Sequence, residues 1–162
     1  MKTVKYEGET HNLLEFLDLT SIPIGERCEL YFNAMNKELI FLIAADIAES
    51  VLHVFEREYP DDLRPRQAIE AARRGYSALA ATYATLAANN GGKFGNPQFA
   101  AYAAAAAANT ANYAYYANTG DVIRVATHVV GNALIADPKA PVIEIMKRYL
   151  NDKLAMVLYE QQ

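Results

Sequence analysis

Charged residues are nearly absent from one long stretch of this sequence. Between Gly75 and Gly120 the only charged side chain is Lys93, and most other positions hold Ala, Tyr, Asn, Thr or Gly. Because charged side chains normally populate protein surfaces, we expect this stretch to be covered. It could be covered inside a helical bundle, or in a homo-oligomer formed through the neutral Ala/Tyr helices.

Cysteine and long apolar runs are also scarce. Cys28 stands alone, which excludes an intramolecular disulfide and favours a reducing compartment. The longest apolar run, Leu39–Ala45, is too short to span a bilayer. Residues 1–9 lack the apolar core of a signal peptide. We therefore expect a cytoplasmic protein without a membrane partner.

The net charge and the absence of known catalytic and binding motifs reduce the number of functional classes that fit this sequence. A net charge of −4 and a pI of about 5.4 argue against a nucleic-acid binder that neutralises phosphates, whereas a basic protein partner would fit. The sequence has no phosphate loop, dinucleotide fingerprint or nucleophile motif. His11 and His53 have no metal-ligand spacing with His128 or Cys28. We expect no enzyme, no cofactor and no metal.

Helix-forming signals dominate the chain. Alanine, the strongest helix former, prevails from Ala68 to Ala117, and strand signals are confined to Thr3–Tyr6. The sequence predicts an all-α fold, a compact Ala-rich bundle of five to seven helices in one domain over residues 1–162. Short helices are expected within 1–35, one capped by Thr10 and one from Pro23 to about Ala34. The core bundle, 36–160, is expected to contain helices at about 36–58, 65–88, 97–117, 121–136 and 140–159.

Acids and arginines gather between Glu58 and Arg73, directly before the neutral stretch. Arg66, Glu70 and Arg73 share one helix face, so Glu70 can pair with either arginine. The ordinary interpretation is that these residues form the solvent-exposed first turn of a helix and make weak ion pairs on its surface. However, Arg64-Pro-Arg66 also presents two guanidinium groups stiffly, as suits binding of a carboxylate or phosphate.

Two further polar residues stand out on apolar helices. Asp46 follows the most apolar run of the chain. Burying it unpaired would be costly, so we expect it to meet Arg64, Arg66 or Arg73, most simply as a structural pair between helices. His128 shares a helix face with Arg124, Gly131 and Asn132, and such a histidine is more typical of a core residue than of a ligand or base. Catalysis at Asp46, Glu70 and His128 would require all three to converge.

Three blocks of the sequence match a known family. They are Asp46-Ile-Ala-Glu49, Phe55-Glu56 followed by Tyr59-Pro-Asp-Asp-Leu-Arg-Pro-Arg-Gln-Ala-Ile-Glu-Ala-Ala-Arg73, and Thr127-His-Val-Val-Gly-Asn-Ala-Leu134. Over about residues 40–136 the chain resembles the all-α putative immunity protein family of bacterial polymorphic toxin systems. The resemblance implies a helical fold, a polar site between helices and neutralisation of a toxin. The chain departs from the family pattern after Arg73, where the sequence turns neutral, and at Asn132, where the family has a second histidine.

Two functions follow as hypotheses. The first is an interaction protein that binds and blocks a toxin or defence effector. The second is a binder of a small anionic ligand, such as a sponge for a signalling nucleotide of the phage anti-defence type, with Arg64, Arg66, Arg73 and Arg124 holding phosphates. The residues predicted to take part in binding are Asp46, Asp62, Arg64, Arg66, Glu70, Arg73 and His128.

Overall fold

An N-terminal β-hairpin is followed by eight helices in the part of the chain that the computed structural model describes, residues 2–75, 78–90, 95–116 and 119–151. The predicted all-α bundle is confirmed, with slightly more helices than the five to seven expected. The additional helix arises at Gly75, where the helix predicted over 65–88 is divided into two.

The hairpin pairs β1 (Thr3–Tyr6) antiparallel with β2 (Glu9–Asn12). Glu7 and Gly8 connect the strands with φ angles of 48° and 86°, as a two-residue turn of the I′ type requires. A strand at Thr3–Tyr6 was expected, but its partner strand was not. The predicted cap at Thr10 is wrong, because Thr10 lies in β2. Asn12 caps the short helix α1 (Leu13–Phe16) by accepting the Leu14 N–H at 2.8 Å.

Local signals place the next two helices as expected. Pro23 precedes α2 (Ile24–Ala34). Asn36 caps α3 (Lys37–Glu58), and its side chain accepts the Glu38 N–H at 2.9 Å. This cap satisfies one of the backbone N–H groups that a helix leaves without an internal partner.

The segment after α3 departs from the prediction. Helix α4 (Arg64–Arg74) has Pro65 in its first turn, as expected, but it ends at Gly75, and α5 spans Ala78–Asn90. Gly75 has a φ of 75°, and its N–H bonds back to the carbonyls of α4. Glycine adopts this left-handed conformation without the steric cost of a Cβ atom, so it is a frequent helix terminator.

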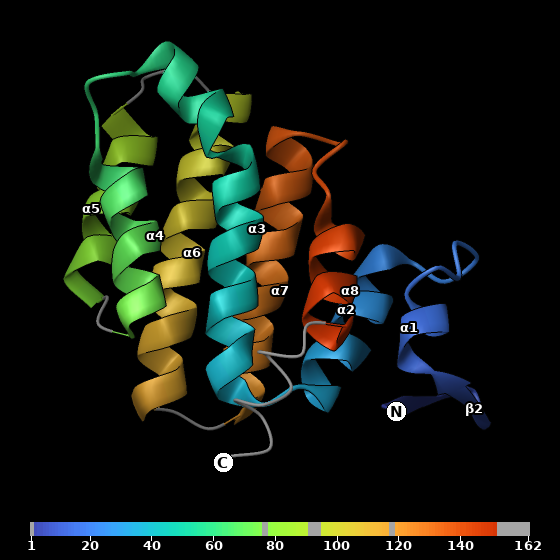
Figure 1. Ribbon diagram of the computed structural model, residues 1–162. Coiled ribbons are helices and arrows are strands. Elements are labelled where there is room, and N and C mark those ends of the chain that lie inside the picture. The colour runs from blue at the N-terminus through green and yellow to red at the C-terminus, as the bar shows by residue number, and fades with distance from the viewer. Residues whose placement is uncertain (1, 76–77, 91–94, 117–118, 152–162) are drawn as a thin grey trace.

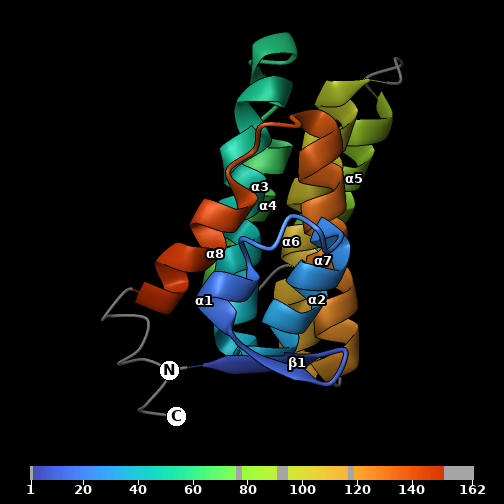
Figure 2. The same ribbon diagram turned by 90° about the vertical axis from the view of Figure 1, so that its right-hand side faces the viewer.

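The remaining helices are α6 (Asn96–Tyr116), α7 (Thr119–Ala136) and α8 (Val142–Asn151). The last helix was predicted to reach about residue 159, but residues 152–162 lie outside the described part. In Figures 1 and 2, α3 and α4 form one layer with α8 beside them, and α5, α6 and α7 form the other. Helix α6 packs against α3, α4, α5 and α7. Its many buried alanines allow four neighbours to approach it closely.

Polar contacts join the N-terminal elements to the bundle. The Tyr31 hydroxyl donates to the Met146 carbonyl at 2.9 Å and so links α2 to α8. The buried Arg27 guanidinium donates to the carbonyls of Leu17 at 2.5 Å and Ile22 at 3.0 Å.

None of the helices in the described residues is long and apolar enough to cross a membrane.

Candidate functional site

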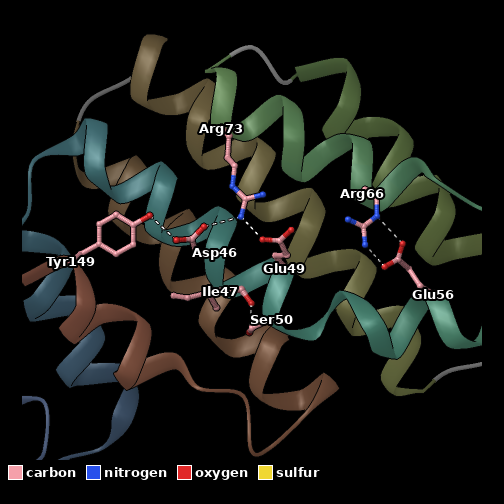
Figure 3. A network of polar contacts seen from close by, with 8 residues as sticks. All are labelled: Asp46, Ile47, Glu49, Ser50, Glu56, Arg66, Arg73 and Tyr149. Carbon is pink, nitrogen blue, oxygen red and sulfur yellow. Dashed lines mark hydrogen bonds and ion pairs between the residues drawn. The ribbon is translucent and has the colours of Figure 1, made fainter. Parts of the chain in front are cut away.

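Asp46 lies at the centre of a polar network between α3, α4 and α8 (Figure 3). Its carboxylate accepts a hydrogen bond from the Arg73 guanidinium at 2.7 Å and another from the Tyr149 hydroxyl at 2.7 Å. The same Arg73 nitrogen also donates to Glu49 at 2.5 Å. The Asp46 side chain is 27% exposed and that of Arg73 32%. The predicted partnership of Asp46 with an α4 arginine is thus confirmed, and the partner is Arg73.

A second pair follows the same alignment of α3 and α4. The Arg66 guanidinium donates to both carboxylate oxygens of Glu56, at 2.9 and 2.5 Å (Figure 3). Glu49 and Glu56 are seven residues apart on α3, as are Arg66 and Arg73 on α4. Seven residues make two helical turns, about 10.5 Å. The acidic edge of α3 therefore matches the basic edge of α4 when the helices run antiparallel.

The other residues of this charged corner do not join the network. Arg64 pairs with Asp62, two residues earlier, through hydrogen bonds at 2.8 and 2.6 Å. Glu70 is exposed. The pairing proposed for Glu70 does not occur, since among the described residues it forms no ion pair with Arg66 or Arg73. The reason is geometric: both arginines point toward the carboxylates of α3 rather than along their own helix.

The ion pairs, hydrogen bonds and burial described above also shift the pKa values of several of these side chains. Burial lowers the pKa of Arg73, but its hydrogen bonds to Glu49 and Asp46 outweigh this effect and raise it above the ordinary value. The hydrogen bond to Glu56 likewise raises the pKa of Arg66. Hydrogen bonding to the Arg64 guanidinium lowers the pKa of Asp62. Burial, followed by the hydrogen bond to Asp46, raises the pKa of Tyr149. These groups stabilise one another in their present protonation states.

His128 lies in another part of the molecule. It is exposed on α7 and lines a groove of about 490 Å³ formed by residues of α5, α6 and α7, the helices of the layer that faces α3 and α4 (Figures 1 and 2). The expectation of a core histidine is therefore wrong. The residues lining the groove are Thr85, Phe99, Tyr102, Ala105, Ala106, Asn109, Tyr113, Arg124, Val125, His128 and Asn132.

The residues singled out from the sequence for catalysis or metal binding do not come together in the described part of the chain. Asp46 and Glu70 do not meet His128, so the constellation considered for catalysis is not assembled. In the described residues, no three His, Cys, Asp or Glu side chains gather where a metal could bind. Burial raises the pKa of the Cys28 thiol to about 12, which keeps it in the unreactive thiol form at neutral pH.

Sequence reasoning missed several residues of both regions. Tyr149 lies in the last predicted helix, about 140–159, and no local signal links it to Asp46. Glu49 and Glu56 could have been found as partners, because their spacing repeats that of Arg66 and Arg73. Asn109 and the aromatic residues of the groove carry no local signal, since they meet the Arg124, His128 and Asn132 face only when α6 and α7 pack.

Comparison with known proteins gives one informative result. No curated protein and no solved structure matches the chain. The family model described as "Imm-5 like putative immunity protein" matches residues 30–136, about two thirds of the chain. The matched region begins within α2 and ends with α7, and so includes both the charged pairs and the groove. The chain therefore belongs to the Imm-5 like putative immunity protein family.

Proposed function

We propose that the protein is an immunity protein that neutralises a toxin or related effector by binding it, without catalysis. Membership of the immunity protein family is the observation that carries this proposal. The matched residues contain most of the helical core, so the likeness extends well beyond a short motif.

The distribution of charge supports a binding role. Three arginines of the charged corner are already engaged by carboxylates of the same chain. In contrast, the surface of α5, α6 and α7 exposes large uncharged side chains such as Tyr83, Leu86 and Tyr115. Protein interfaces are enriched in aromatic residues and depleted of Lys, Glu and Asp. The exposed surface of α5 and α6, which carry no charged residue, therefore includes side chains typical of an interface.

The alternative, capture of an anionic signalling nucleotide by Arg64, Arg66, Arg73 and Arg124, has less support. Arg124 lies on α7, apart from the other three, and each of those three would have to exchange a carboxylate for a phosphate and leave a carboxylate unpaired. We do not propose it. Calorimetric titration with cyclic nucleotides would test it, and binding abolished by Arg73→Ala would revive it.

The decisive experiment is co-expression with the proteins encoded by the genes that flank the gene of this chain, each tested as the toxin. Cells producing the toxin should stop growing, and the chain should restore growth and co-purify with the toxin as a complex. An unrelated toxin that kills at the same dose is the matched control, because specific binding predicts no protection from it. If growth is not restored and no complex forms, the proposal is wrong.

A further inference from the structure

The groove between α5, α6 and α7 differs in charge from the rest of the molecule. Arg124 and His128 are the lining residues that can carry charge, and no carboxylate lines the groove among the described residues. The flanking helices α5 and α6 contain no charged residue. The protein as a whole has a net charge of −4. Arg124 therefore supplies positive charge to the groove, and its carboxylate partner, Asp121, is not among the residues that line it.

The Arg124 guanidinium is only loosely held. Its ion pair with Asp121 spans 3.5 Å, and the two side chains are 56% and 40% exposed. A pair of this length and exposure contributes little energy. By comparison, Arg66 and Arg73 contact their carboxylates at 2.5 to 2.7 Å. Arg124 could therefore bind a carboxylate of another molecule without breaking a strong internal contact.

Neighbouring side chains add hydrogen-bonding capacity. Asn109, His128 and Asn132 line the groove, and across the described part of the chain none of their side chains has a protein hydrogen-bond partner. On α7, Arg124, His128 and Asn132 follow one another at intervals of four residues, so they form one row. A carboxylate accepts several hydrogen bonds and donates none, which suits a row of guanidinium, imidazole and amide groups.

Apolar surface surrounds this polar row. Phe99, Tyr102 and Tyr113 line the groove, together with the small Ala105 and Ala106. Their spread along α6, fourteen residues, corresponds to about 21 Å. A groove of this length, lined by aromatic and small side chains, fits a segment of polypeptide.

We propose that this groove binds a segment of the partner protein that presents a carboxylate flanked by apolar or aromatic side chains. Arg124 would bind the carboxylate, His128 and Asn132 would add hydrogen bonds, and the aromatic residues would contact the flanking side chains. The choice of an acidic segment follows from charge complementarity at the groove, and it is opposite to what the net charge of the protein favours. The inference rests on the proposed function, because it locates the binding of that same partner.

The test is the dissociation constant, measured by calorimetry, between the full-length chain and the purified toxic protein found among the products of its neighbouring genes. Arg124→Glu should weaken binding at least a hundredfold, because it places like charges together, and Arg124→Gln at least tenfold. Arg74→Glu is the matched control: Arg74 is also an exposed arginine, but it lies on α4 in the opposite layer. This control should bind within threefold of the wild type. Circular dichroism checks that every variant is folded.

The outcomes separate the two proposals. If the wild-type chain fails to bind the toxin, the proposed function is wrong and this inference falls with it. If the wild type binds and Arg124→Glu binds equally well, only this inference is overturned. It is also overturned if the wild-type chain sediments as a dimer that Arg124→Glu dissociates, because a second copy then occupies the groove. Recovery of Arg124→Glu binding by Lys at one acidic position of the toxin would support it and identify the carboxylate.

Discussion

Replacing Arg73 with alanine should lower the free energy of unfolding by about 2 kcal/mol. The substitution removes one charge-assisted hydrogen bond to Asp46 at 2.7 Å and one to Glu49 at 2.5 Å. Loss of a partner costs about 3–5 kcal/mol for a fully buried ion pair and about 0–1 kcal/mol for an exposed one. Asp46 and Arg73, at 27% and 32% exposed, lie between these limits. Glu49, at 47%, adds little, and Tyr149 still donates to Asp46.

Urea unfolding followed by circular dichroism at 222 nm measures this change, and the slope should stay constant. For a chain of this length the loss corresponds to a fall of about 4–8 °C in melting temperature. Arg66→Ala on the same helix is the matched control. It should cost about 1 kcal/mol or less, because Arg66 is 43% exposed and water can replace its contacts more easily.

A double-mutant cycle between Arg73→Ala and Asp46→Ala isolates the pair, and its coupling energy should exceed about 1 kcal/mol. Equal losses from Arg73→Ala and Arg66→Ala, together with a coupling below about 0.5 kcal/mol, would refute the reasoning. Water would then already solvate Asp46, and the network would not join α3 to α4.

Three other changes test separate features. Gly75→Ala should cost about 1 kcal/mol in urea unfolding, because φ is 75° while an added Cβ would meet no atom within 4 Å; an unchanged midpoint would show that α4 does not need this turn. The pKa of Tyr149 is raised in the folded protein, so the protonated hydroxyl stabilises the fold. This stabilisation is fully present below the ordinary tyrosine pKa of about 10 and is lost as pH rises through the folded-state pKa. Melting temperatures of the wild type should therefore fall more steeply above pH 10 than those of Tyr149→Phe, and parallel curves would contradict this. Arg27→Met should cost about 2–3 kcal/mol, because the carbonyls of Leu17 and Ile22 lose their donor; a loss below about 0.5 kcal/mol in urea would mean that water replaces the guanidinium.

Local chemistry made much of the fold predictable from sequence. Asn36 and Pro65 mark helix starts because capping and proline geometry act within a few residues. Gly75 was harder to interpret, since glycine occurs both within helices and at their ends. The division between α4 and α5 was therefore missed. The family could be identified because the block from Tyr59 to Arg73 combines prolines, acids and arginines at defined spacing.

The sequence by itself determined the helical class, most helix starts, the family, and the requirement that Asp46 meet an arginine. Only the tertiary structure decided that this arginine is Arg73, that Tyr149 reaches Asp46 from 103 residues away, and that His128 lies apart in a groove. The physical reason is the distance along the chain over which each kind of interaction acts. Caps and prolines act over one helical turn, whereas ion pairs and grooves depend on how helices distant in the chain pack against one another.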